Sequence, residues 1–409
     1  MSLVSLYDEA SLWMTPSGAK DGKLFSELPT DGSGDFTFSR GSNLAATRVG
    51  ADGLIEKGRE NLLFPSKLTN GVIQTRCSIT TGVTDPYGGA EAVKFITSTD
   101  ASTSHYINKT TSIAAIGQVM TMSVTAKANG YDFLRLEQGN NSAGATFELT
   151  GEGTIVSDNI TASIQSIGDG WYRCSATMNT VSTSFAWVAT FMPTSSISYT
   201  GDGVSGGFLY GAQLELGLVA TDYIETGAST AQAGVLENEP RLDYSGGASC
   251  PSLLLEPQRT NIFEQSEYFS GTYWGKTGTG GASAPVVTQN YAISPEGLKN
   301  ASRVQFDTNG STSAHRSGLV RDFAFTTGDK YAISCWVKAT SGNSEIFTFR
   351  IAGEQVGGEK TATNEWQLFT ETHTATVTTT DDFGMQIRGN YSSQTSDILI
   401  YGKQLESAV

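Results

Sequence analysis

Short stretches of the chain alternate apolar and polar residues. Residues 172–178 (Tyr-Arg-Cys-Ser-Ala-Thr-Met) and 347–351 (Phe-Thr-Phe-Arg-Ile) are two examples. A period of two places one side of a strand in a core and the other side in water, which is typical of antiparallel sheets. Turn-forming residues interrupt these stretches roughly every ten to fifteen positions, for example at Gly168-Asp-Gly170 and Gly357-Gly358. The pattern predicts an all-β fold.

The chain also repeats itself at a distance of about two hundred positions. The phrase Arg59-Glu-Asn-Leu-Leu-Phe64 returns as Arg259-Thr-Asn-Ile-Phe263, and Tyr210-Gly-Ala-Gln-Leu-Glu215 returns as Tyr401-Gly-Lys-Gln-Leu-Glu406. Roughly seven or eight strands are expected in each copy, and a two-sheet sandwich is the simplest way to arrange them. We therefore predict two tandem antiparallel jelly-roll β-sandwiches after a short N-terminal extended segment.

The predicted organisation has four parts. Residues 1–58 form an N-terminal extended attachment segment, 59–228 the first jelly-roll module, 229–257 an ordered linker and 258–409 the second jelly-roll module. Within the first part we expect two short strands, at 36–41 and 46–49. This part is too small to bury much core alone. Its apolar residues are therefore expected to pack on the first module or on another subunit; they are Leu12, Trp13, Leu24, Phe25 and Leu28.

Several residues occupy matching places in the two copies. Asn61 matches Asn261 and Gln213 matches Gln404, so we expect them to superpose and to fix the first and last strands through hydrogen bonds to the backbone. Trp171 and Trp366 also match. These two tryptophans, like Trp336, are interpreted as core residues.

Composition and charge narrow the functional classes. The net charge is −15, and no cluster of cations suggests a nucleic-acid surface. No apolar run is long enough for a membrane span, and the N-terminus lacks an export signal. Four cysteines stand singly and three histidines lie far apart, so we expect no metal and no cofactor.

Candidate chemistry is limited to binding. Jelly-roll glycosidases carry a Glu-x-Asp-x-x-Glu run, which this sequence lacks, and Asp381-Asp382 is interpreted as a solvated turn. Aromatic rings in polar, glycine-rich loops can stack on sugars. The ligand-binding candidates are Tyr268, Tyr273, Trp274 and Tyr391, with packing against the linker or a neighbouring subunit as the alternative.

Several phrases carry a resemblance: Phe36-Thr-Phe-Ser-Arg-Gly41, Pro240-Arg-Leu-Asp-Tyr244 and Leu253-Leu-Leu-Glu-Pro-Gln-Arg-Thr-Asn261. With these phrases the chain resembles structural and fibre-like proteins of tailed bacteriophages that carry concanavalin-like, carbohydrate-binding-module-like jelly rolls. The resemblance implies a non-enzymatic virion structural protein, such as a head or tail fibre, a decoration protein or a tail component, that contacts other virion proteins and host-surface glycans. The alternatives are a free glycan-binding, lectin-like protein and, less favoured, a glycan-degrading enzyme.

The resemblance also bears on assembly and on the end of the second copy. Virion appendages are commonly symmetric, so we expect a homo-oligomer located in the virion, with a trimer as the first choice. Residues 217–227 follow the first closing phrase and have no counterpart after the second. We expect either a chain that continues beyond Val409 or a last strand that is completed differently.

Overall fold

The computed structural model describes residues 3–20, 22–37, 47–139, 142–237, 239–245, 247, 249–254, 259–342 and 344–408. Antiparallel strands supply nearly all of its regular structure, and the one helix among these residues is α1 (Leu3–Glu9). No described helix has the length and apolar character needed to cross a membrane. The all-β fold class predicted from the alternation is confirmed.

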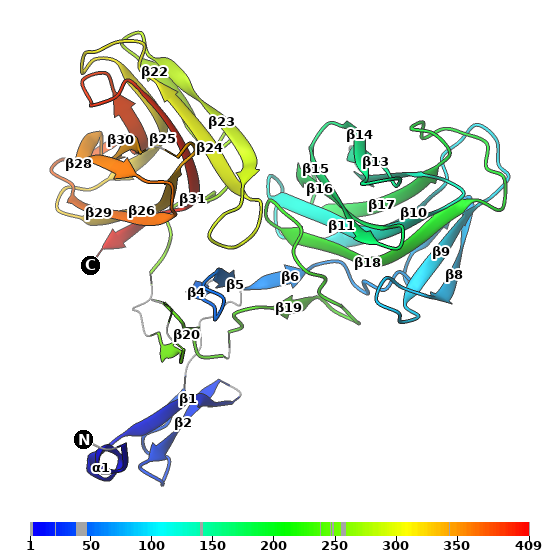
Figure 1. Cartoon of the computed structure of the whole chain (residues 1–409), viewed down its shortest axis with the longest axis horizontal. Coiled ribbons are helices and arrows are strands. Elements are labelled where there is room, and N and C mark those ends of the chain that lie inside the picture. The colour runs from blue at the N-terminus through cyan, green and yellow to red at the C-terminus, as the bar shows by residue number, and fades with distance from the viewer. Residues whose placement is uncertain are drawn as a thin grey trace. The chain divides into compact units, whose positions relative to one another are not determined.

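The first sandwich consists of two six-stranded sheets (Figure 1). One has the order β14-β13-β12-β17-β10-β7 and the other β15-β16-β11-β18-β9-β8. The strands of the former sheet are β7 (Ile73–Thr75), β10 (Tyr106–Ser112), β12 (Phe133–Gln138), β13 (Ala143–Glu148), β14 (Thr154–Asp158) and β17 (Ser184–Met192). Those of the latter are β8 (Cys77–Val83), β9 (Ala92–Thr97), β11 (Val119–Asn129), β15 (Thr161–Gly168), β16 (Trp171–Asn179) and β18 (Gly206–Leu216).

The second sandwich consists of two five-stranded sheets, of order β22-β25-β30-β27-β28 and β23-β24-β31-β26-β29. The strands of the former are β22 (Gly275–Thr279), β25 (Arg316–Phe325), β27 (Glu345–Ile351), β28 (Glu354–Ala362) and β30 (Thr379–Arg388). Those of the latter are β23 (Ser283–Ala292), β24 (Ala301–Asp307), β26 (Lys330–Ala339), β29 (Gln367–Thr374) and β31 (Thr395–Ala408). The two tandem antiparallel sandwiches predicted from the repeat are confirmed.

Each sandwich encloses its own hydrophobic core. On β11 the side chains of Met120, Met122 and Val124 are fully buried in the first core, while Thr121 and Ser123 lie on the opposite face of the strand. Burial of apolar surface stabilises the fold by about 25 cal/mol per Å2. The apolar side chains therefore determine which face of each sheet packs against the core.

The two ends of each repeat lie beside one another, as the matched phrases predicted. Leu62 N donates to Leu214 O at 2.8 Å, and Ile262 N donates to Leu405 O at 2.7 Å. The same residue of the opening phrase thus bonds the same residue of the closing phrase in both sandwiches.

The N-terminal segment contains a three-stranded sheet and short paired strands. The sheet is formed by β1 (Trp13–Lys20), β2 (Lys23–Leu28) and β3 (Phe36–Thr37), and β4 (Thr47–Val49) pairs with β5 (Ile55–Lys57). Directly after this segment, β6 (Arg59–Asn61) pairs with β19 (Ala231–Ala233) of the linker. The strand expected at 36–41 is described only over β3, because residues 38–46 lie outside the described residues. Leu24 is buried, whereas Leu12 and Phe25 are exposed.

Described residues of the linker form hydrogen bonds with this segment. It contains β20 (Leu242–Asp243) paired with β21 (Ser252–Leu253). Val49 N donates to Asp243 Oδ1 at 2.9 Å, and Tyr244 N donates back to Val49 O at 3.0 Å. Residues 238, 246, 248 and 255–258 lie outside the described residues.

By its contacts the chain divides into two compact units, residues 1–254 and 255–409. The strands of the first sandwich lie between Ile73 and Leu216 and those of the second between Gly275 and Ala408. The finer boundaries after residues 58, 228 and 257 stay predictions.

Candidate functional site

Strand β30 presents two different faces. Phe383, Met385 and Ile387 point into the second core, and the alternate residues Asp382, Gln386 and Arg388 lie on the opposite face. Because side chains alternate along a strand, the sheet β22-β25-β30-β27-β28 carries its polar residues on the face turned away from the core.

A row of residues crosses this face from strand to strand. Thr277 pairs with Gly318, Gly318 with Gln386, and Gln386 with Thr348. A Cβ atom at Gly318 would lie 3.3 Å from Thr277 Oγ1 and 3.7 Å from Gln386 Cβ. The glycine therefore leaves the middle of the row without a side chain, between two polar neighbours.

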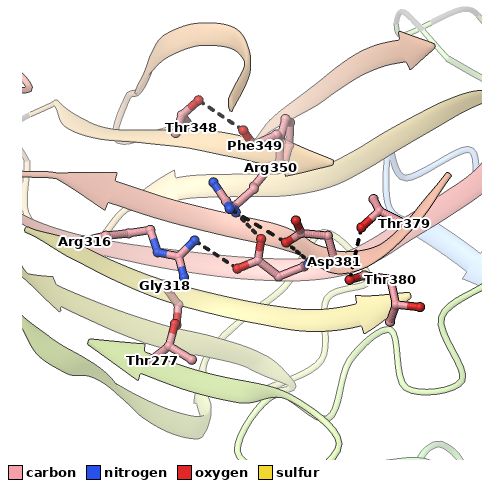
Figure 2. A network of polar contacts seen from close by, with 10 residues as sticks. Thr277, Arg316, Gly318, Thr348, Phe349, Arg350, Thr379, Thr380 and Asp381 are labelled. Carbon is pink, nitrogen blue, oxygen red and sulfur yellow. Dashed lines mark hydrogen bonds and ion pairs between the residues drawn. The ribbon is translucent and has the colours of Figure 1, made fainter. Parts of the chain in front are cut away.

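An ion-pair cluster stands next to this row (Figure 2). Arg316 Nη1 donates to Asp382 Oδ2 at 2.9 Å, and Arg350 Nε donates to the other oxygen of the same carboxylate. Asp381 Oδ1 accepts a hydrogen bond from Asp382 N and lies 3.9 Å from Arg350 Nη2. Three of these side chains are largely buried, with 10% to 15% of Arg316, Arg350 and Asp382 exposed.

The interpretation of Asp381-Asp382 as a solvated turn is wrong. Both residues belong to β30, and Asp382 is 8% exposed. The physical reason is non-local: two arginines from the neighbouring strands β25 and β27 offset the cost of burying the carboxylate.

Two guanidinium nitrogens of this face are buried and have no hydrogen-bond partner in the described part of the chain: Nε of Arg388 and Nη1 of Arg350. Burial raises the pKa of the Tyr391 phenol above its ordinary value, and hydrogen bonding with Thr348 and Gln386 opposes that rise. Buried polar atoms in folded proteins are nearly always satisfied. Neighbouring side chains cover these atoms, so a ligand would meet this face at its partly exposed residues, Arg388 and Tyr391.

We define the polar face of the second sandwich by its members: Thr277, Arg316, Thr348, Arg350, Asp382, Gln386, Arg388 and Tyr391. Of these residues only Tyr391 was a candidate from the sequence. The alternation Asp382, Gly384, Gln386, Arg388 against Phe383, Met385, Ile387 was a usable signal. It indicates a strand with one core face and one face of hydrogen-bonding groups.

The aromatic candidates have different surroundings. Arg321 lies over the Tyr273 ring at 4.6 Å, and both line a hollow of about 160 Å3 together with Glu264 and Asp322. Tyr268 packs over Gly271, where a Cβ atom would lie 2.5 Å from the tyrosine ring. Tyr268, Tyr273 and Tyr391 are all half-buried. Their role in ligand binding stays a prediction.

Trp274 is not the exposed residue that we expected. Only 2% of it is exposed, its ring contacts Phe263 and Phe269 in the core, and its Nε1 donates to Gln265 O at 2.9 Å. A glycine-rich surrounding indicated a loop, but three-dimensional contacts with distant aromatic residues place this side chain inside.

The matched tryptophans differ in burial. Trp171 is 5% exposed and packs near Phe208, whereas Trp366 is half-buried and donates its Nε1 to Ile293 O at 3.2 Å. Trp336, interpreted as a core residue, is also half-buried and lies on the side of β26 opposite Cys335 and Val337.

The corresponding face of the first sandwich largely satisfies itself. On β12, Arg135 donates through Nε to Glu137, through Nη1 to Thr146 and through Nη2 to Ser142 O, so each nitrogen has a partner. Asn108 Oδ1 is buried on that face without one. Buried polar atoms without a hydrogen-bond partner therefore occur in both sandwiches among the described residues; in the first they also include both amide atoms of Gln138.

Metal binding finds no support in the described ranges, where no group of three His, Cys, Asp or Glu side chains could hold an ion. The matched histidines have local partners: His105 Nδ1 lies 2.7 Å from Arg76 O, and His315 Nδ1 lies 2.7 Å from Thr312 Oγ1.

Comparison with known proteins identifies no family. No protein-family model matches the chain, and no curated protein matches it. Solved structures similar to it include β-sandwich carbohydrate-binding modules. The N-terminal CBM22-1–CBM22-2 tandem domain of Xyn10C from Paenibacillus barcinonensis is 10% identical, covers 90% of this chain and 99% of its own length, and has a TM-score of 0.25.

Two further structures are similar to the same degree. The family 11 carbohydrate-binding module of Lic26A-Cel5E from Clostridium thermocellum is 14% identical over 38% of this chain and 97% of that one, with a TM-score of 0.26. The extracellular domain of ANXUR2 from Arabidopsis thaliana is 10% identical; the match covers 90% of this chain and 95% of that one, with a TM-score of 0.24. At these identities and TM-scores the likeness carries no information about what this chain binds.

Proposed function

We propose that this chain is a non-catalytic glycan-binding protein, and that the polar face of the second sandwich contacts the sugar. The observation that supports this most is that Arg388 and Tyr391 are partly exposed on a face lined by further hydrogen-bonding side chains. This is nearer to the lectin-like alternative considered from the sequence than to a purely structural protein.

The chemistry of the face suits sugar hydroxyls. The partly exposed Arg388 guanidinium offers hydrogen-bond donors to such hydroxyls, whereas the Gln386 amide is fully buried. The half-buried Tyr391 supplies an aromatic ring of the kind on which a sugar can pack. Arg316 and Arg350 pair with Asp382 and Asp381, so the charges of this cluster balance and do not favour a charged glycan.

The arrangement of the carboxylates favours binding over hydrolysis. A glycosidase needs two carboxyl groups on either side of the scissile bond, one of them able to give up a proton. Both oxygens of Asp382 accept from arginines, and its neighbour Asp381 accepts from the backbone. Neither carboxyl group is positioned to flank a sugar bond.

A glycan array with the full chain tests the proposal. We expect wild-type protein to bind a set of related glycans and Arg388→Ala to weaken that binding at least tenfold, because Arg388 is half-exposed and can be replaced without opening a core cavity. Arg135→Ala, on the equivalent face of the first sandwich, is the matched control and should bind as wild type does. Equal binding by both variants, or no binding by wild-type protein, would refute the assignment.

The biological setting is a separate inference that is supported by the sequence resemblance alone. We infer that the chain is a component of a tailed-bacteriophage virion, where a glycan-binding sandwich would contact the host surface. Mass spectrometry of purified particles from a phage that encodes the chain tests this: stoichiometric recovery with the particles is expected, and recovery only in the unassembled fraction would leave the free lectin-like protein.

A further inference from the structure

A row of alternating aromatic rings and lysines crosses the outer face of one sheet of the first sandwich. Trp171 of β16 and Phe208 of β18 both pair with Lys127 of β11, which lies between them. On its other side Phe208 pairs with Lys94 of β9. Leu209, the next residue of β18, belongs to the core, so Phe208 and the residues paired with it lie on the face turned away from the core. We call Trp171, Lys127, Phe208 and Lys94 the aromatic–lysine row.

Further aromatic contacts surround Phe208. Its ring centre lies 6.3 Å from that of Trp171, which is only 5% exposed and closes one side of the row. Tyr210, two residues along β18 on the same face, contacts Tyr87 with ring centres 5.8 Å apart. Tyr87 is 76% exposed and Phe208 is half-buried. The ring surface open to a ligand is therefore that of Phe208 and Tyr87.

Residues 217–227, which follow β18, cover the neighbouring part of the same face. Gln213 is fully buried there; its Nε2 donates to Asp222 O at 3.2 Å, and its Oε1 accepts from Ile224 N at 2.7 Å. Phe208 stays half-buried beside this cover. The row is therefore a partly exposed surface in a sandwich whose covering residues are present.

Both lysines of the row are available to an anion. Lys94 and Lys127 are half-buried, and neither has an ion-pair or hydrogen-bond partner among the residues that the structure describes. The adjoining loops carry three carboxylates: Asp85, Glu91 and Asp169. The first accepts backbone hydrogen bonds within its own loop, the second is paired with Lys67, and the third, in the turn before β16, is exposed. Positive charge is therefore greatest at the Lys94 end of the row, away from that turn.

The second sandwich carries the same row in a changed form. Lys338 pairs with Leu399, and Leu399 pairs with Arg303; these are the counterparts of the last three members of the row. Asp397 neutralises the Arg303 guanidinium, whose Nε donates to Oδ1 at 2.8 Å. Gly206 stands in the place of Asp397 in the first sandwich. The first copy thus has a ring where the second has a leucine, and it lacks the carboxylate that would neutralise its cation.

We propose that the aromatic–lysine row binds an acidic glycan, with a sugar ring packed on Phe208 and a sugar carboxylate beside Lys94. Sugar rings pack on aromatic side chains, and a hydrogen bond between an ammonium and a carboxylate is stronger than one between neutral groups. The row crosses four strands about 4.8 Å apart and so spans about 14 Å, which suits a short oligosaccharide. This site goes beyond the polar face of the second sandwich and does not depend on it.

Two other polyanions or polymers fit the row less well. Strands β16, β11, β18 and β9 are inner strands of their sheet, so their backbone groups are already paired and offer no edge to an extended peptide. A nucleic acid needs a run of cations that neutralise its phosphates, whereas the row has two cations in a chain of net charge −15. An acidic glycan with one or two carboxylates matches this charge.

Isothermal titration calorimetry of the full chain tests the proposal with two acidic probes, trigalacturonic acid and sialyllactose. The methyl ester of the first and lactose are their uncharged counterparts. We expect at least one acidic probe to bind at least tenfold more tightly than its uncharged counterpart. Lys94→Met should weaken that binding at least tenfold, and Lys127→Met should weaken it too. Lys338→Met is the matched control, because Lys338 is the counterpart of Lys127 in the second sandwich, and it should bind as wild type does.

The remaining outcomes overturn the proposal. No binding of either acid at millimolar concentration, equal affinity for an acid and its uncharged counterpart, or unchanged binding in Lys94→Met would each do so. An oligothymidylate that binds more tightly than both acids would identify the ligand as a nucleic acid instead. Binding that is lost in Arg388→Ala but kept in Lys94→Met would locate the acidic sugar on the polar face of the second sandwich, which retains the proposed function and refutes this site. Thermal unfolding of each variant checks that its sandwich is folded.

Discussion

In each sandwich, the side-chain oxygen of one asparagine accepts hydrogen bonds from both the opening and the closing phrase of the repeat. Asn61 Oδ1 accepts from Leu63 N at 3.0 Å and from Leu214 N at 3.1 Å, and Asn261 Oδ1 accepts from Phe263 N and Leu405 N, both at 3.1 Å. The matched positions therefore form the same two bonds, one local and one to the last strand. An aliphatic side chain would leave both backbone amides without this acceptor.

Asn261→Ala should lower the free energy of unfolding of the second sandwich by about 1–2 kcal/mol. Asn261→Asp keeps an acceptor oxygen and should cost less. Urea unfolding followed by circular dichroism measures the loss, and the exposed Asn364→Ala serves as the control. An unchanged stability in Asn261→Ala would show that the shared bonds do not fix the chain ends.

Lys403 is a residue at which the two copies differ in charge. Its counterpart in the first sandwich is Ala212, which is fully buried in the core. Lys403 is also fully buried; its Nζ lies 4.5 Å from the Trp274 ring centre and 5.8 Å from that of Phe263, without a hydrogen-bond partner among the described residues. Burial lowers the pKa of Lys403 to about 7. The charged form is therefore costly in the folded state.

Lys403→Met should stabilise the second sandwich, and more at low pH than at high pH. Between a folded pKa near 7 and an ordinary value of 10.5, the unfolded chain holds a proton that the folded chain has released. The free energy of unfolding of the wild-type protein hence rises with pH between about 7 and 10.5, and it is lowest below pH 7. We expect Lys403→Met to add about 2–4 kcal/mol at pH 6 and less than about 1 kcal/mol at pH 10. Denaturant unfolding at both pH values tests this, and equal effects would contradict it.

At the scale of the element, the bulges in β18 and β31 have the same backbone conformation, but different side chains lie next to them. A Cβ atom at Gly211 would lie 3.2 Å from the ring of Tyr223, one of the residues that follow β18, and one at Gly402 would lie 3.8 Å from Trp336 Cδ1. Both glycines have a left-handed φ, which costs an L-residue about 1 kcal/mol or more. Only Gly211 has in addition a neighbour that must move.

Gly211→Ala should therefore cost more stability than Gly402→Ala, at about 2–3 against about 1–2 kcal/mol. Chemical denaturation of the two variants gives both values under the same conditions. Losses of equal size would mean that Tyr223 moves away from the added methyl group at little energetic cost. A larger loss for Gly402→Ala would contradict the packing described here.

Local alternation was enough to predict the strands. The stretches at 172–178 and 347–351 lie in β16 and β27, because a period of two depends only on neighbours along the chain. The ion-pair cluster could not be predicted in this way. Asp382 is buried only because Arg316 and Arg350 arrive from strands 66 and 32 positions away. Without knowledge of these distant partners, two consecutive acidic residues in the sequence look like an exposed turn.

For the whole molecule, the repeat was the most informative signal in the sequence. It predicted two sandwiches and the pairing of their ends, because a phrase that recurs in the same order must form the same elements. It could not predict where the copies diverge in burial. Gln213 and Gln404 are the same residue in the same phrase, but the first is covered by residues 217–227 and the second is exposed. Whether the outer face of a sheet is buried depends on which other segment packs on it, and the sequence of the sheet itself does not show this.

Two separate hydrophobic cores predict two separate unfolding events. The first core gathers residues from Leu63 to Leu214 and the second from Phe263 to Leu405, and the chain divides into compact units between them. A domain with its own core can unfold as its own cooperative unit. Differential scanning calorimetry of the full chain should therefore resolve two transitions at neutral pH.

The variants above assign each transition. Lys403→Met should raise one midpoint, and Gly211→Ala should lower the other, by several degrees for each kcal/mol in domains of this size. A substitution in one sandwich should leave the other transition in place, because the two hydrophobic clusters have no residue in common. A single transition that both substitutions shift would mean that the sandwiches unfold as one unit.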